Sequence, residues 1–105
     1  MSEIKIQSEY DDLDKYIYKY NGNIYYCKKN TDITHNPYGP AITWKDGSKF
    51  YYIDSKCHRL DGPAMIYSNG EEEYWINDEC LTKEEFEIHP ERLKYLNKEY
   101  LLCLK

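Results

Sequence analysis

The sequence predicts a mainly β fold with a C-terminal α-helical segment. Three observations support this: an internal repeat in the middle of the chain, hairpin-turn dipeptides between ring-rich segments, and helical spacing from residue 82 onward. The 105 residues have room for a single domain. We therefore expect an antiparallel meander of about three 23-residue β-hairpins in one sheet, capped by a short C-terminal helix pair.

The repeat is clearest between residues 35–57 and 58–80. When the second segment is aligned under the first, both carry a His, a Gly-Pro-Ala and a turn Gly, and the match runs without a gap to a final Cys. The equivalent pairs include His35 and His58, Gly39 and Gly62, Pro40 and Pro63, Tyr51 and Tyr74, and Cys57 and Cys80. Residues 16–34 form a partial copy, and residues 1–15 are expected to be an N-terminal tail or an edge strand.

Each copy contains a dipeptide that suits a β-hairpin turn. The dipeptides are Asn21-Gly22, Asp46-Gly47 and Asn69-Gly70. They supply the positive-φ residues of a two-residue type I′ turn, so three hairpins are expected. Pro40 and Pro63 lack an N–H and fit the first position of a strand, which makes residues 55–62 a connecting bend.

A two-residue turn at Asp46-Gly47 fixes which side chains share a face. It sets Ile42 opposite Tyr51 and Trp44 opposite Lys49. One face then carries Ile42, Trp44, Tyr51 and Ile53, which we expect to be core. The other carries Ala41, Thr43, Phe50 and Tyr52, together with Ala64, Ile66, Glu73 and Trp75 of the next copy. Both faces are apolar.

The C-terminal segment has the signals of two helices. Thr82 and Glu85 form a capping box ahead of a short turn that contains Phe86. Pro90 suits the first position of a second helix of about 14 residues. Its apolar stripe is Leu93, Leu96, Tyr100 and Cys103. Such a helix covers one face of the sheet, so the other face needs another molecule.

Phe50, Tyr52 and Trp75 are the predicted binding residues. They are placed on the uncovered face, where the small Ala41 and Ala64 would leave hollows beside large rings. One expected occupant is a second subunit or a host protein, for which Glu73 would set a charge preference. The other is a planar nucleotide-type ligand stacked on a ring, with Arg59 or Lys49 near its phosphate.

The remaining residues give no sign of catalysis. Cys57 and His58 are neighbours that point apart on an extended chain, and no orienting carboxylate is implied by spacing. The Cys and His spacings match no metal site, so no catalytic residue, metal or cofactor is expected. His35 and His58 are interpreted as donors to nearby carbonyls that fix the bend, with Arg59 and Asp61 paired beside them.

Composition bears on partners and location. The net charge of −5 makes nucleic acid an unlikely partner, and no apolar run is long enough to cross a membrane. Without an export signal, the chain is expected to be soluble and cytoplasmic with reduced thiols. An excess of Lys, Asn, Ile and Tyr is typical of AT-rich codons, which indicates a viral, phage or parasite genome.

The repeat resembles a known class. A hairpin unit of this length with Asn-Gly and an aromatic pair is similar to MORN repeats, and the segment 58–64, His-Arg-Leu-Asp-Gly-Pro-Ala, resembles a variant found in tailed-phage and giant-virus proteins. The first copy departs from this pattern at Asn36 and Tyr38, which favours a structural part for Arg59 and Asp61. The resemblance implies scaffolding or binding and no catalytic activity.

Together these features predict a non-enzymatic binding protein of phage or viral origin. It would self-associate, with a dimer favoured, or dock a host protein through its aromatic face, in a host-interaction or counter-defence role in the host cytoplasm. The alternative is a small protein that sequesters a nucleotide-type signal by ring stacking.

Overall fold

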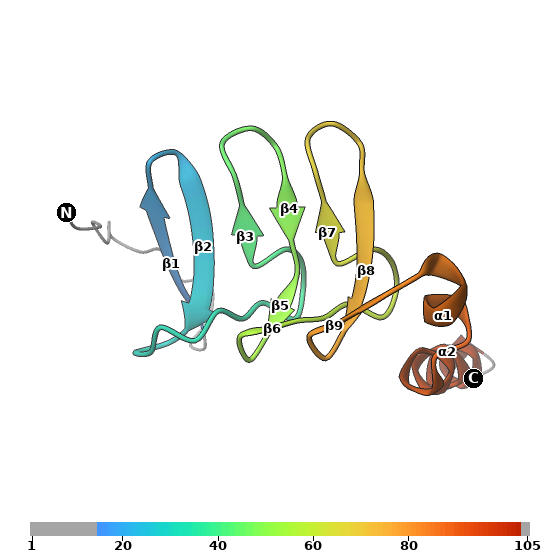
Figure 1. Ribbon diagram of the computed structural model, residues 1–105. Helices are drawn as coiled ribbons and strands as arrows, with labels where there is room; N and C mark the ends of the chain where they lie inside the picture. The colour runs from blue at the N-terminus through green and yellow to red at the C-terminus, as the bar shows by residue number, and fades with distance from the viewer. Residues whose placement is uncertain (1–14, 104–105) are drawn as a thin grey trace.

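The structure is a computed structural model that describes residues 15–103, with side chains described for residues 17–97. Its strands form one twisted layer, and its helices lie beyond the last strands at one end (Figure 1). The mainly β, antiparallel character with C-terminal helices is therefore confirmed. Of the segment expected to be a tail or an edge strand, only Lys15 lies within the described residues, where it begins the first strand.

The main sheet has seven strands, all paired antiparallel in the order β1-β2-β3-β4-β7-β8-β9. They are β1 (Lys15–Tyr20), β2 (Asn23–Lys28), β3 (Ile42–Thr43), β4 (Lys49–Phe50), β7 (Met65–Ile66), β8 (Glu72–Ile76) and β9 (Glu79–Leu81). A small second sheet joins β5 (Tyr52–Ile53) to β6 (Lys56–Cys57). Lys56 and Cys57 lie in the segment expected to be a bend. That prediction was wrong, because the adjacent Asp54 and Ser55 both adopt positive φ and close a tight turn without glycine.

The hairpin turns differ from the prediction in two of three cases. Asn21 and Gly22 both have positive φ, as a type I′ turn requires. In the next two hairpins only Gly47 and Gly70 have positive φ, and the amides of both donate to the carbonyl three residues earlier. These are longer turns, in which the glycine adds a bulge residue to the second strand.

The extra residue shifts the register by one. Ile42 pairs with Phe50 and Thr43 with Lys49, so the predicted pairing of Ile42 with Tyr51 was wrong. Because side chains alternate along a strand, a shift of one residue moves each side chain of β4 to the face opposite to the predicted one, relative to β3. Phe50 therefore shares a face with Ile42 and Trp44, whereas Tyr51 shares the opposite face with Ala41 and Thr43. We call these the Phe50 face and the Tyr51 face.

Residues 35–57 and 58–80 make the same backbone hydrogen bonds at equivalent positions. Ala41 N donates to Phe50 O and Ala64 N to Glu73 O, both at 2.9 Å. Asp54 N donates to His35 Nδ1 at 2.9 Å, and its equivalent Asn77 N donates to His58 Nδ1 at 3.0 Å. The two segments thus follow the same backbone path, also where their residue types differ.

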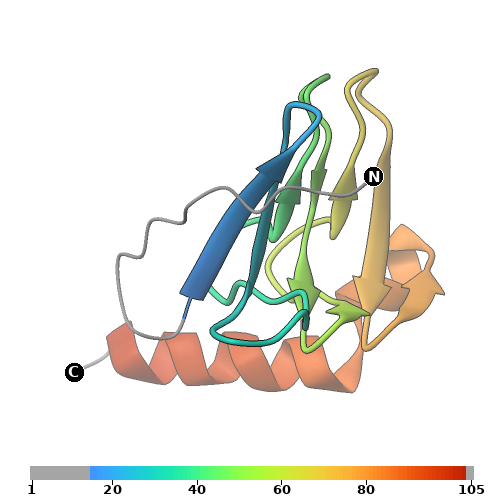
Figure 2. The same cartoon turned by 90° about the vertical axis from the view of Figure 1, so that its left-hand side faces the viewer.

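The helices begin and end close to where the sequence predicts. Helix α1 (Lys83–Glu87) has the capping box of Thr82 and Glu85, and helix α2 (Pro90–Cys103) starts at its proline. Phe86 of α1 packs on Tyr74 of β8, with ring centroids 4.6 Å apart. Helix α2 runs across the strand direction at this end of the molecule (Figure 2).

The helices do not cover a face of the sheet along its length, contrary to the expectation. Their main contacts are with β8, β9 and each other. Leu93 and Leu96 of the predicted buried stripe are 48% and 38% exposed, because α2 projects from the end of the sheet instead of lying on it. The side chains of Tyr100 and Cys103 lie outside the described part of the chain.

Candidate functional site

A set of large rings lies on the Phe50 face, and we call it the aromatic row. Its members are Trp44, Phe50, Tyr52, Tyr67 and Trp75. Phe50 sits at the centre, with Trp44 edge-on at 4.8 Å and Tyr67 edge-on at 5.8 Å between ring centroids. This geometry is favourable for aromatic pairs and holds the rings in fixed orientations.

Exposure within the row differs from the prediction. Phe50 is only 6% exposed, so its assignment as an exposed binding residue was wrong, whereas Trp44, assigned to the core, is 44% exposed. The error at Phe50 follows from the one-residue shift in register, which places its ring between Trp44 and Tyr67. Tyr52, Tyr67 and Trp75 are half-buried. Phe50 is therefore the buried support of the row, and the other four rings form its accessible surface.

Glu73 places a negative charge at one end of the row. Its Oε1 accepts a hydrogen bond from Trp75 Nε1 at 3.0 Å. Burial, followed by the charge of Glu73, raises the pKa of the Tyr67 hydroxyl. Glu73 is the equivalent of Phe50 in the next copy, so a half-buried carboxylate occupies the position that holds the central ring in the preceding hairpin. The row thus combines exposed rings with an anionic group.

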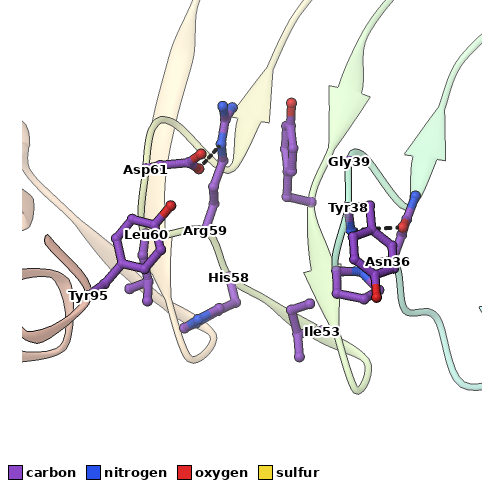
Figure 3. A pocket seen from close by; sticks show the side chains of 11 residues that line it. Asn36, Tyr38, Gly39, Ile53, His58, Arg59, Leu60, Asp61 and Tyr95 are labelled. Atoms are coloured by element: carbon purple, nitrogen blue, oxygen red, sulfur yellow. Dashed lines mark hydrogen bonds and ion pairs between the residues drawn. The ribbon is translucent and has the colours of Figure 1, made fainter. Parts of the chain in front are cut away.

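A pocket of about 290 Å³ lies on the Tyr51 face, at the foot of two equivalent loops (Figure 3). Its lining residues are Asn36, Pro37, Tyr38, Gly39, Tyr51, Ile53, His58, Arg59, Leu60, Asp61 and Tyr95. Tyr95, from α2, lines one side of the pocket. Tyr38, which is 81% exposed, lines the opposite side. The volume is at the low end for small-molecule sites, which run from about 300 to 1,000 Å³.

Arg59 is already engaged inside the protein. Its Nε donates to Asp61 at 2.7 Å, its Nη1 donates to Pro63 O at 3.0 Å, and its guanidinium lies 4.1 Å from the centre of the Tyr51 ring. In the preceding copy Asn36 Nδ2 makes the equivalent bond to Pro40 O at 3.0 Å. The expected Arg59–Asp61 pair is confirmed, and its charge balance leaves Arg59 poorly suited to bind a phosphate.

The position of Lys49 also disagrees with its suggested role. Lys49 pairs across the sheet with Thr43 and Ile66, which places it on the Tyr51 face, away from the aromatic row. It therefore cannot neutralise a phosphate on a ligand stacked against Trp75. A nucleotide on the row would instead meet the carboxylate of Glu73.

The histidines fix turns, although not as donors to carbonyls. Nδ1 of His35 and of His58 accepts from a backbone N–H 19 residues later, which corrects the predicted direction of the hydrogen bond. His89 Nδ1 accepts from Glu91 N at the start of α2. Burial lowers the pKa of His58, which favours the neutral ring that this bond requires. These contacts are structural.

The thiol of Cys57 has low reactivity. Cys57 is 1% exposed, and burial raises its pKa to about 12, so it carries negligible thiolate at neutral pH. Its equivalent Cys80 is exposed, so the two thiols at equivalent positions differ in burial. Among residues 15–103, no group of three or more His, Cys, Asp or Glu residues is arranged to hold a metal ion.

Comparisons with protein-family models, curated proteins and solved structures give no match to this chain. In the described part of the chain, no helix combines the length and apolar character needed to cross a membrane. Tyr67 was not among the predicted site residues; it is the equivalent of Trp44, which the sequence analysis assigned to the core, so the same assignment hid both rings. No sequence signal pointed to Tyr38 or Tyr95 of the pocket.

Proposed function

We propose that this chain is a non-enzymatic binding protein that docks a protein partner on the aromatic row. The observation that carries the proposal is a sheet face with partly exposed Trp and Tyr rings, along which no helix of residues 15–103 lies. Trp and Tyr dominate binding surfaces because they bury a large area while few rotatable bonds are fixed. Phe50 holds the rings of Trp44 and Tyr67 in place, so little further ordering of these two is needed on binding.

The charge of Glu73 specifies the partner further. A guanidinium stacks favourably on Trp and Tyr rings, and a nearby carboxylate adds an ion pair. Glu73 lies within hydrogen-bonding distance of the Trp75 indole, so both groups are available to one side chain. The partner we propose therefore presents an arginine in an exposed segment.

We also propose that the chain contains MORN-like hairpin repeats. Equal hydrogen bonds at equivalent positions of the two copies support the interpretation of residues 35–80 as MORN-like hairpin repeats. The resemblance of residues 58–64 to phage and giant-virus repeats, with the AT-rich composition, supports a phage or viral interaction protein that acts on a host protein in the cytoplasm.

The pocket on the Tyr51 face supports a second candidate, the binding of a small molecule. Tyrosines line it, and its one arginine is neutralised by Asp61. Since a phosphate would compete with this pair, the ligand class is an uncharged planar compound such as a nucleoside. Calorimetry compares nucleosides with the matching nucleotides. Heat from nucleosides supports this candidate, and no heat from either class at about 50 μM protein eliminates it.

Intrinsic fluorescence tests the leading proposal, because Trp44 and Trp75 are the two tryptophans of the sequence and both lie in the row. Short peptides that contain arginine are titrated against peptides with glutamate at the same position. We expect a saturable change with the arginine peptides alone, weakened in Glu73→Gln but not in the control Glu79→Gln, an exposed strand residue. Equal responses to both peptides, or none, would contradict the proposal.

A further inference from the structure

One large ring lies at the same place in each of the three hairpins. Tyr20, Trp44 and Tyr67 each directly precede a hairpin turn, and we call them the tip rings. Tyr20 and Trp44 are exposed, and Tyr67 is half-buried. The three turns lie at the end of the sheet opposite to α1 and α2 (Figure 1, Figure 2), so neither helix covers this end.

All three tip rings project from the Phe50 face. Trp44 and Tyr67 both pack on the ring of Phe50. Tyr20 reaches the same face through the pairing of β1 with β2 and of β2 with β3, because paired side chains share a face. Neighbouring tip rings are two strands apart, which is about 9.6 Å at the usual strand spacing. The tip rings therefore form a regular line across the sheet.

A short polar side chain separates each tip ring from the next. Asn23 lies across the first hairpin from Tyr20, and Ser48 lies across the second from Trp44. Oδ1 of Asn23 accepts from Lys45 N at 2.8 Å, and Oγ of Ser48 accepts from Ser68 N at 3.0 Å. Both donors begin the turn of the next hairpin, so these hydrogen bonds hold the two short side chains close to the backbone. The line thus alternates a large ring with a short side chain.

A carboxylate takes the place of the short side chain in the third hairpin. The carbonyl of Glu71 accepts from Tyr67 N as the carbonyl of Ser48 accepts from Trp44 N, both at 2.9 Å. Glu71 is exposed. Glu73 lies two residues further along the chain and therefore projects from the same face. The line of tip rings ends at these two carboxylates.

We propose that the partner binds the tip rings with a polyproline II segment, which has a proline at every third residue and an arginine three residues beyond the last proline. This proposal rests on the proposed function and specifies the segment that its arginine belongs to. A polyproline II helix has three residues per turn, so the same side recurs about every 9.3 Å, close to the spacing of the tip rings. Two prolines then lie between rings, over Asn23 and Ser48, and the arginine meets Glu71 and Glu73.

Other backbone conformations fit the line less well. Residues on one side of a β-strand recur about every 6.8 Å, which does not match the ring spacing. One side of an α-helix recurs about every 10.5 Å over seven residues, but its carbonyls are already hydrogen-bonded within the helix. The carbonyls of a polyproline II segment have no internal partner. The exposed hydroxyl of Tyr20 and indole N–H of Trp44 are donors suited to such carbonyls.

Isothermal titration calorimetry of the wild type with three peptides of equal length tests the proposal. The first is Pro-Ala-Ala-Pro-Ala-Ala-Arg, the second moves the inner proline by one residue, and the third has alanine at both proline positions. Each is made in both chain directions, because a polyproline II helix presents similar sides in either direction. We expect the first peptide, in one of its directions, to bind about tenfold more tightly than the other two.

The outcomes separate this proposal from the proposed function. Equal affinities for all three peptides would overturn the polyproline II segment but leave the arginine site intact. The absence of binding by any peptide would contradict both. Tighter binding of a helix-forming peptide with leucines seven residues apart and the same arginine would also overturn the polyproline II segment.

A variant at the first tip ring locates the binding site. Tyr20 lies outside the aromatic row, so Tyr20→Ala should remove most of the advantage of the first peptide and leave the affinity for the alanine peptide unchanged. Ile88→Ala, which also shortens an exposed apolar side chain, is the control and should behave like the wild type. Circular dichroism checks that both variants are folded. A folded Tyr20→Ala that keeps the full preference for the first peptide would contradict the proposal, and the peptide comparison on the wild type does not depend on either variant.

Discussion

Residues 35–57 and residues 58–80 follow the same backbone path, but many of their side chains differ. Both have a His that accepts from a turn amide, a buried Ala, and a Gly in the hairpin turn. Among the positions that differ in residue type are Asn36 against Arg59 and Phe50 against Glu73, and the shared cysteines, Cys57 and Cys80, differ in burial. The differing residues determine what each surface offers.

The difference is largest at the centre of the sheet. Phe50 fills the space between Trp44 and Tyr67, whereas Glu73 brings a carboxylate to the equivalent position and keeps it hydrogen-bonded to Trp75. An apolar position in one hairpin is thus an anionic position in the next. The two hairpins thus share backbone hydrogen bonds although only the second carries an anionic group at this position.

The largest expected effect is at Phe50. Phe50→Ala should lower the free energy of unfolding by about 3–5 kcal/mol, because it removes a buried ring and leaves a cavity. Glu73→Ala should cost only about 1 kcal/mol, the scale of one hydrogen bond. Urea denaturation measures both. If both substitutions lower the free energy of unfolding equally, Phe50 is not the buried support of the aromatic row.

A smaller effect is expected where Gly62 and Arg59 meet. A Cβ at Gly62 would lie 2.9 Å from the Arg59 Cζ, whereas a Cβ at the equivalent Gly39 would lie 3.9 Å from Asn36 Nδ2. Gly62→Ala should therefore destabilise by about 1–2 kcal/mol and Gly39→Ala by much less. In an Arg59→Ala background the cost of Gly62→Ala should largely disappear. Simple additivity in this double-mutant cycle would contradict the account.

The smallest effect concerns pH. Burial lowers the pKa of His58, so its contribution to stability is present above the unfolded value of about 6.5 and is lost as pH falls through the folded pKa. His58→Asn retains an acceptor near Nδ1 but does not titrate. The free energy of unfolding, measured by urea denaturation, should fall between about pH 6.5 and 5 by at most about 1 kcal/mol more for the wild type than for the variant. If the stability of the wild type and of His58→Asn changes with pH in the same way, His58 is not the cause of the pH dependence.

Local signals in the sequence predicted several parts of the fold. The capping box at Thr82 and the proline at position 90 located both helices, because these residues act within one turn of the chain. The alignment of the two copies predicted which backbone positions are equivalent. The Arg59–Asp61 pair also followed from residues close in sequence.

The errors come from features that local signals do not determine. Asp46-Gly47 suits a two-residue turn or a longer turn with a bulge, and the choice moves every facing residue by one position. Turns at Asp54-Ser55 and Asn77-Asp78 reach positive φ without glycine, so β6 was missed. The apolar stripe of α2 gave no information on where the helix docks, since α2 packs on α1, and α1 is placed by the contact of Phe86 with Tyr74.

The central claim is that a cationic side chain is bound where exposed rings meet Glu73. The most direct measurement is the ¹H–¹⁵N signal of the Trp75 indole, whose N–H donates to Glu73, during titration with an arginine-containing peptide. The account predicts a saturable shift of this signal and of backbone amides in the row, and little change at His58 or Tyr95 of the pocket. A shift confined to the pocket, or an unmoved Trp75 signal while the peptide binds, would contradict it.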